Sequence, residues 1–233
     1  MTSNSDLRSI RVWDLPTRVF HVLLIAAVAG LFITSEIGGD LMKFHFWFGY
    51  GVLSLVFFRV IWGLLGGHWS RFVNFLPTPA QLLAYINNIR HGSHTPTVGH
   101  NPMGALSVFA MLVVLMLQVF SGLMSDDEIS NAGPWTSWVA SDWVSWATNF
   151  HKEIGSNALI ALLFLHVASV LYYKYFKSED LLTPMLKGDK VLPSDTPASR
   201  DSTTSRLFAL GVWLGCAYAV FRLVNWASLG LDL

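Results

Sequence analysis

Five long apolar runs in a chain of 233 residues constrain the fold more than any other feature. The hydrocarbon core of a bilayer is about 30 Å thick, and about 20 helical residues cross it. Because lipid offers no hydrogen-bond partners to the backbone, each crossing run must be a helix. The sequence therefore predicts an all-α membrane protein with helices near Arg18–Thr34, Phe44–Leu65, Met103–Met124, Ile154–Phe176 and Leu207–Ser228.

The composition agrees with a membrane protein. Hydrophobic residues make up 53% of the chain and charged residues 13%, about half the usual ~25% of soluble domains. Disordered chains need the opposite balance, and a soluble bundle with five buried helices is the weaker alternative. The 15 basic residues are balanced by 15 acidic ones, so the chain lacks the positive excess of a nucleic-acid binder. Membrane lipid is the expected surrounding, and no nucleic acid is expected as a partner.

Cysteine and histidine content narrows the chemistry. With Cys216 as the single cysteine, an intrachain disulfide, a CxxC zinc or redox motif, a CxxCH haem attachment and a cysteine-ligated iron–sulfur cluster are excluded. Eight histidines are the main chemical resource of this apolar chain.

The distribution of basic residues predicts the orientation, because cytoplasmic loops carry the excess of Lys and Arg. With the N-terminus inside, eleven basic residues fall on the inner side and only Lys43 and Lys152 on the outer side before the fifth helix. The polar residues up to Asp14 are not a cleavable signal peptide. We therefore expect a multi-pass protein of a bacterial inner membrane, with a cytoplasmic N-terminus and a periplasmic C-terminus.

The segments between the runs complete the predicted organisation. We expect a cytoplasmic segment at residues 1–17, a transmembrane bundle of four helices at 18–190, a flexible linker at 191–205 and an extra transmembrane helix at 206–233. Thr78-Pro79 opens an amphipathic stretch that ends at Arg90, typical of a helix on the inner membrane surface. The outer loop Ser125–Phe150 holds four tryptophans, which favour the membrane interface.

Four histidines lie at membrane depth and form two pairs. Ionisable residues inside spans are costly and are treated as functional. His45 and His151 lie near the outer ends of their helices, and His21 and His166 lie toward the inner side. Facing imidazoles in a bundle core are typical of a bis-histidine haem site. Zinc or copper also binds histidine, but no carboxylate or thiol shares the depth, so haem is the better interpretation.

Two glycines and an arginine extend this interpretation. Gly49 and Gly155 each follow an outer histidine by four residues, which leaves room for a macrocycle or else serves ordinary helix packing. Arg59 lies about 21 Å deeper than His45 on a similar helix face. A buried guanidinium needs an anion, and a propionate of the inner haem suits it. The alternative is an arginine that reaches the inner interface.

Three further polar residues indicate a function less specifically. His100 lies in a Gly-His-Asn-Pro run and is either an interfacial loop residue or a neighbour of the inner haem or a quinone. Gln118 and Ser121 lie in the outer half of the third run. They either join helices by hydrogen bonds or contact the outer haem or a quinone.

Several of these runs together resemble the prokaryotic cytochrome b561 and Ni-hydrogenase cytochrome b family, over about residues 10–190. The matching pieces are Val12–His21 (VWDLPTRVFH), His45–Tyr50 (HFWFGY), Arg59–Gly63 (RVIWG), Gly99–Pro102 (GHNP) and the His151/His166 pair.

The resemblance implies a four-helix membrane cytochrome with two b haems, one near each face, that passes electrons between the quinone pool and redox partners. It assigns His21 and His166 to the inner haem, and His45 and His151 to the outer one. Two features depart from the family. His151 and His166 are fifteen residues apart, where fourteen is expected in much of the family, and the fifth helix lies outside its four-helix core.

Several functions compete at this point. The leading one is an electron-transfer protein or oxidoreductase subunit that links quinone to a periplasmic partner such as a cytochrome c. A superoxide oxidase that delivers electrons to quinone is an alternative, but an anionic substrate is attracted by positive charge, and the outer loops are acidic. A cytochrome b anchor of a hydrogenase-like oxidoreductase and a structural membrane protein without cofactor are the others. The outer acidic residues are Glu36, Asp40, Asp126, Asp127, Glu128 and Asp142.

Overall fold

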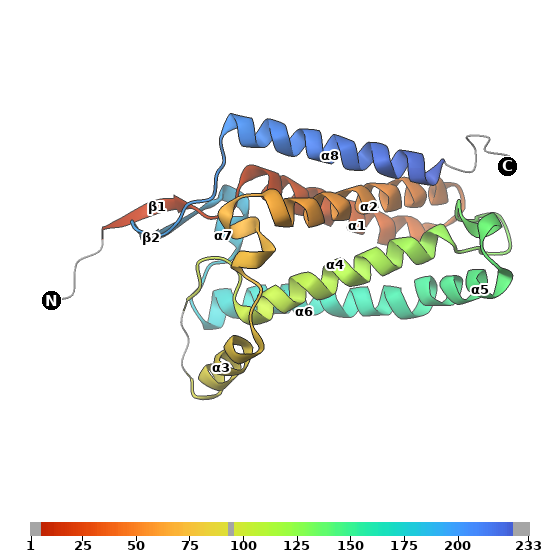
Figure 1. Ribbon diagram of the computed structural model, residues 1–233. Coiled ribbons are helices and arrows are strands. Elements are labelled where there is room, and N and C mark those ends of the chain that lie inside the picture. Colours follow the sequence, from red (N-terminus) through yellow and green to blue (C-terminus); the bar gives the residue numbers. More distant parts are fainter. Residues whose placement is uncertain (1–5, 93–95, 226–233) are drawn as a thin grey trace. The chain divides into compact units, whose positions relative to one another are not determined.

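Five long helices dominate the computed structural model, which describes residues 6–92 and 96–225 (Figure 1). Within those residues, all five helices are long and apolar enough to cross a membrane. The five predicted runs are thus confirmed as helices. Their bounds are α1 (Leu15–Ile37), α2 (Met42–Leu65), α4 (Pro102–Leu123), α6 (Ser156–Phe176) and α8 (Thr203–Val224).

Shorter elements connect the long helices. They are β1 (Leu7–Arg11), η1 (Gly39–Leu41), η2 (His68–Ser70), η3 (Phe72–Asn74), α3 (Pro79–Arg90), η4 (Thr136–Trp138), α5 (Ser141–Asn149), the π-helix η5 (Phe150–Gly155), α7 (Leu182–Lys187) and β2 (Asp189–Pro193).

The described chain forms two compact units. The first unit takes the residues up to Val19 together with Val60–Phe109 and Phe164–Leu210. The second unit takes Phe20–Arg59, Ala110–Leu163 and the residues from Gly211 onward.

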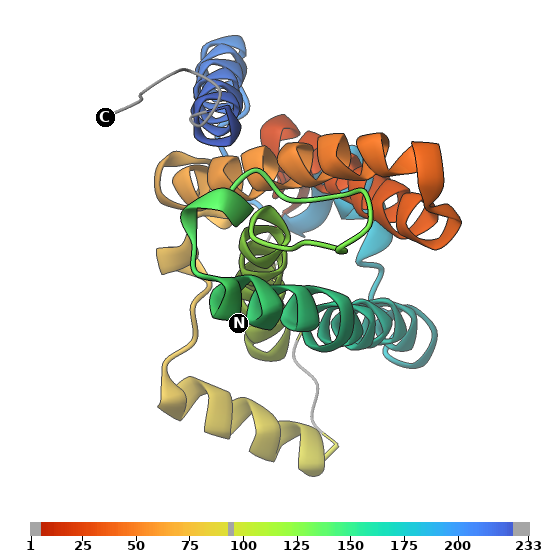
Figure 2. The ribbon, with the colours of Figure 1, turned by 90° about the vertical axis from the view of Figure 1, so that its right-hand side faces the viewer.

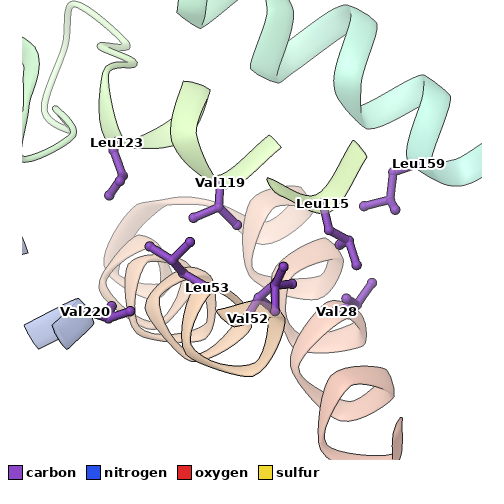
Figure 3. Close-up of a cluster of buried hydrophobic side chains, with 9 residues drawn as sticks. Val28, Val52, Leu53, Leu115, Val119, Leu123, Leu159 and Val220 are labelled. Atoms are coloured by element: carbon purple, nitrogen blue, oxygen red, sulfur yellow. The ribbon is translucent and has the colours of Figure 1, made fainter. Parts of the chain in front are cut away.

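The core of the second unit contains buried side chains from all five long helices (Figure 3). Lipid tails are as apolar as leucine, so close packing, rather than escape from water, holds such helices together. A Cβ at Gly30 would lie 2.6 Å from the Phe48 ring, so α1 and α2 need a glycine at this contact. The fifth helix belongs to the same core through Val220. The cluster is Val28, Val52, Leu53, Val56, Leu115, Val119, Leu123, Leu159 and Val220.

The chain after α4 folds back and packs against other parts of the second unit (Figure 2). The Trp135 amide donates to the Leu123 carbonyl (2.9 Å), and its ring lies 5.8 Å from Phe120. The indole Nε1 donates to the Leu223 carbonyl in the last turn of α8 (3.2 Å). Carbonyls in the last turn of a helix have no intrahelical partner, so this tryptophan closes the end of the fifth helix.

The outer loop is shorter than the predicted Ser125–Phe150. Helix begins at Ser141 and runs without a break through α5, η5 and α6. Trp143, Trp146 and Phe150 recur at intervals of three and four residues, and their rings contact one another, with Trp146 stacked on Phe150. Side chains three or four apart are neighbours on a helix, so the tryptophans reflect an aromatic helix face as well as an interface.

The predicted amphipathic segment is confirmed as helix α3. Thr78 is its N-cap: the Thr78 hydroxyl accepts from the Gln81 amide, and the Gln81 side chain accepts from the Thr78 amide. Pro79 stands at the first helical position, where its missing N–H costs nothing. Within the first unit, the Tyr85 hydroxyl is hydrogen-bonded to that of Tyr173 on α6.

Residues 191–205 differ from the expected flexible linker. β2 pairs antiparallel with β1, with Leu7 opposite Pro193. The Ser199 amide donates to the Arg11 carbonyl (2.7 Å), and the Trp69 indole donates to the Pro197 carbonyl (2.8 Å). A segment rich in Pro, Ser and Thr is irregular in backbone, but here its polar groups are held by β1 and by Trp69.

Asp14 anchors the start of α1 in the first unit. Its side chain is fully buried, and as the N-cap it accepts from the Thr17 amide (2.8 Å). It also accepts from the Gly67 amide (3.0 Å), the Ser70 hydroxyl (2.9 Å) and the Trp62 indole (3.2 Å). One carboxylate therefore joins the first turn of α1 to the end of α2 and the turn after it.

Asp14→Asn should destabilise the first unit. The amide cannot accept from every donor that faces the carboxylate, and each buried donor left unsatisfied costs roughly 1–3 kcal/mol. We expect a lower apparent melting temperature in detergent, with Asp195→Asn at an exposed position as the matched control. Equal melting temperatures for the two variants would show that Asp14 is not a structural anchor.

Candidate functional site

Two of the four predicted histidines meet in the second unit. His45 comes from the first turn of α2 and His151 from η5. Their ring centres are 6.2 Å apart, and the ring planes are 82° to one another. Residues more than a hundred positions apart in the chain thus present their imidazoles to one space.

Each imidazole is held through its Nδ1. The Leu31 carbonyl lies 3.1 Å from Nδ1 of His45, and the Gln118 carbonyl lies 2.8 Å from Nδ1 of His151. Since a carbonyl only accepts, Nδ1 of each neutral ring carries the proton and Nε2 carries the lone pair. This is the tautomer that leaves Nε2 available for a metal, with the carbonyl fixing the ring.

A cavity of about 390 Å³ lies between these histidines and is lined mostly by apolar side chains. That volume falls in the usual range for cofactor sites. Metal–imidazole bonds of about 2 Å on both sides, with ~1.1 Å from each nitrogen to its ring centre, put ring centres about 6 Å apart. The observed separation agrees, so the residues present fit a bis-histidine haem.

The two predicted glycines have different surroundings. Gly49 lines the cavity, and a Cβ there would meet nothing within 4 Å, which fits the interpretation of room for a macrocycle. A Cβ at Gly155 would collide with the side-chain oxygen of Gln118 and lie 2.8 Å from Phe150. Gly155 therefore serves close packing, the alternative that the sequence left open.

Sequence reasoning missed Gly122. A Cβ at this position of α4 would lie 2.8 Å from Cε1 and 3.1 Å from Nδ1 of His151. The absence of a side chain lets the imidazole lie against the helix. Glycine is frequent in membrane helices for packing alone, so nothing in the sequence separates Gly122 from the others.

The sequence also missed the π-helical turn η5, although one signal pointed to it. The spacing of fifteen residues between His151 and His166 exceeds the fourteen of the family resemblance by one. A π-bulge accommodates one extra residue in a helix and is frequent at functional sites. The turn Phe150–Gly155 contains His151 itself.

The other predicted pair does not fall in one unit. His21 lies on α1 in the second unit, and His166 lies on α6 in the first. Both side chains are half-buried. Their pairing stays a prediction. Arg59, at the end of the second unit's part of α2, is only 3% exposed, so its guanidinium does not reach solvent at the surface of the chain.

The remaining histidines lie in or near the first unit's loops. His100 packs between Trp13 (ring centres 4.8 Å apart) and Phe75 (4.5 Å). His68 lies 4.9 Å from the Trp69 ring. His91 is exposed, and His94 lies outside the described residues.

The acidic loop of the second unit is built around Asp127. Its carboxylate accepts from the Asn131 side chain (2.7 Å) and from the backbone amides of Ile129, Ser130 and Asn131 (2.9 Å each). These bonds, that from the Asn131 side chain first, hold the pKa of Asp127 well below its usual range. Glu128 is exposed at the tip, so the two acids differ: one shapes the loop and the other faces outward.

Comparison with known proteins identifies the family of this chain. The family model described as prokaryotic cytochrome b561 matches residues 12–188. A protein of Bradyrhizobium diazoefficiens, named as a probable Ni/Fe-hydrogenase B-type cytochrome subunit, is 20% identical over 213 residues, which cover 78% of this chain and 86% of that relative. No solved structure gives a significant match. With five apolar helices and a family match over most of its length, the chain is an all-α, multi-pass membrane protein and belongs to the prokaryotic cytochrome b561 family.

Proposed function

We propose that this b-type cytochrome binds two haems and passes electrons between the quinone pool and a periplasmic redox partner in a respiratory chain. The observation that carries the proposal is the His45–His151 pair, whose Nε2 atoms are free of the carbonyls that hold Nδ1. The apolar cavity between the rings supports the same conclusion. Haem held there would supply one-electron redox chemistry.

The chain's own residues have distinct tasks in this proposal. His45 and His151 would hold the iron of the outer haem. The carbonyls of Leu31 and Gln118 keep both rings in the ligating tautomer and raise their basicity. Gly49 leaves space for the edge of the macrocycle. The mostly apolar lining lowers the local dielectric, which tunes the reduction potential.

The proposed inner haem site consists of His21, His166 and Arg59. Two half-buried imidazoles at one predicted depth would hold its iron. The burial of Arg59 disfavours an arginine that reaches the inner interface, and the propionate contact stays a prediction. A guanidinium suits a carboxylate because it offers two parallel N–H donors.

The proposal also includes the orientation of the chain and the membrane in which it lies. The excess of Lys and Arg on one set of loops favours a cytoplasmic N-terminus and a periplasmic C-terminus in a bacterial inner membrane. The outer haem then lies near the periplasm, next to the acidic loop at Asp126–Glu128. A basic periplasmic protein such as a cytochrome c is the partner that this charge favours.

A second candidate is the cytochrome b subunit of a hydrogenase-like oxidoreductase. The printed name of the Bradyrhizobium relative favours it. The two functions share the haems and the quinone and differ in the protein that delivers or takes electrons. Purification from the native membrane in mild detergent separates them: an iron–sulfur subunit that co-purifies in fixed ratio supports the second, and its absence favours a diffusible partner.

The histidine pairs predict haem content. A pyridine haemochrome assay should find two b haems per wild-type chain. His45→Ala or His151→Ala should remove the outer haem and leave one. His21→Ala or His166→Ala should remove the inner haem and also leave one, with a different reduced-minus-oxidised spectrum. A wild-type ratio of one haem per chain would contradict the pairing.

Arg59→Gln should lower the potential of one haem. A positive charge nearby favours reduction, and removing it should cost roughly 1–2 kcal/mol, or several tens of millivolts. The outer haem should change much less. Redox titration followed by optical spectra measures both potentials. If neither moves, Arg59 interacts with something other than a propionate.

Charge reversal on the outer face should slow electron exchange with a basic cytochrome c. Asp127 shapes the loop, so we choose the exposed Glu128 and Asp142. Glu128→Lys combined with Asp142→Lys should reduce the second-order rate at low ionic strength and flatten its salt dependence, because complementary charge mainly accelerates encounter. Stopped-flow mixing measures the rate, with Asp195→Lys as the control. A rate indifferent to salt and to reversal would point to a neutral partner or quinone.

A further inference from the structure

The π-helical turn that carries His151 is stabilised by side chains. In a π-turn the hydrogen-bond pattern shifts from i→i+4 to i→i+5, which leaves carbonyls open to other donors. Three successive carbonyls accept from side chains: that of His151 from Gln118, that of Lys152 from Ser156, and that of Glu153 from Asn157. Two of these donors lie on the same helix, while Gln118 reaches across from α4.

Gln118 bonds His151 twice. Its backbone carbonyl accepts from the imidazole Nδ1 (2.8 Å), and its side-chain Nε2 donates to the His151 carbonyl (2.8 Å). The second bond also fixes the orientation of the amide, because a carbonyl needs a donor. Ring and backbone of one histidine are thus both tied to one residue of α4.

Two glycines make this arrangement possible. Gly155 leaves the space that the Gln118 side-chain oxygen occupies, since a Cβ there would collide with it. Gly122 leaves the space for the imidazole, since a Cβ there would lie 2.8 Å from Cε1 of His151. Gln118 therefore packs between the π-turn and α4 with its amide directed at the carbonyl.

The opposite ring is held less tightly. Nδ1 of His45 has the Leu31 carbonyl at 3.1 Å and the Thr34 hydroxyl at 3.4 Å. No side-chain amide ties the His45 backbone among the interactions of the described residues. The orientation of the two rings, 82° apart, is therefore set more strictly on the His151 side.

We propose that Gln118 is a positioning residue of the outer haem site: through its two bonds to His151 across the π-turn, it sets the imidazole plane nearly perpendicular to that of His45. This inference rests on the proposed haem ligation by these histidines. Nearly perpendicular axial imidazoles make two of the iron d orbitals almost equal in energy. The oxidised outer haem then gives a highly anisotropic low-spin electron paramagnetic resonance signal, whereas near-parallel rings give a rhombic one.

Gln118→Met tests the side-chain bond. Methionine keeps the length and lacks the donor, and the backbone carbonyl at 118 remains. We expect both haems to be retained at purification, with the outer signal less anisotropic and the inner signal unchanged. A weakened Nδ1–carbonyl bond makes the imidazole a poorer electron donor, so the outer potential should rise. Haem transfer to excess apomyoglobin should be about 10-fold faster, the usual scale for loss of an outer-shell contact.

Asn157→Ala is the matched control, because it removes a donor from the nearby carbonyl of Glu153, which is not on a ligand, and the Asn157 side chain is exposed. It should leave the signal, the potential and the haem transfer rate unchanged. If Gln118→Met does not fold, Gly155→Ala displaces the Gln118 side chain from the other direction and should give the same changes.

The outcomes separate the inference from the proposed function. A colourless wild-type protein would overturn the haem proposal itself. A wild-type outer haem with a rhombic signal, or a Gln118 variant with wild-type signal and potential, would overturn the positioning role while leaving ligation intact. Equal changes in the Asn157 control would show that the π-turn responds to any lost donor, and that Gln118 has no special role.

Discussion

A polar group buried inside the protein has no water to form hydrogen bonds with, and this constraint shapes both units of the protein. In the first unit the buried carboxylate of Asp14 is surrounded by donors from α1, α2 and the turn after α2. In the second unit, hydrogen bonds within the chain hold the imidazole Nδ1 atoms and three successive carbonyls of the π-turn. Where these partners lie decides which side chains can face the cavity.

Hydropathy and depth were enough to predict the spans and the outer histidine pair. Five spans are visible because each apolar run must be helical in lipid, and His45 and His151 were paired because both stood near the same predicted face. Helix direction and span length place the two residues at one depth, and the sequence pattern contains both. The angle and hydrogen bonds of the two rings depend on neighbours that sequence spacing does not specify.

The features that the sequence did not predict depend on contacts distant in the chain. The pairing of β1 with β2 joins two segments of the first unit that are far apart in the sequence, and no local sequence pattern predicts it. The role of Gly122 depends on a ring supplied by another helix. The carbonyls of the π-turn accept from Gln118, Ser156 and Asn157, each of which is an ordinary polar residue when considered alone.

The β1–β2 ribbon has a consequence for how the protein is made. Arg11 contacts the Lys187 carbonyl, 176 residues further along the chain. Ribosomes add about 5–20 residues per second, so the N-terminal strand waits roughly 10–35 s for its partner to emerge. Until then the four long helices that precede β2 are inserted while the β1–β2 pair of the first unit has not formed. Biogenesis of this cytochrome therefore includes an interval in which β1 has been synthesised and its partner strand β2 has not.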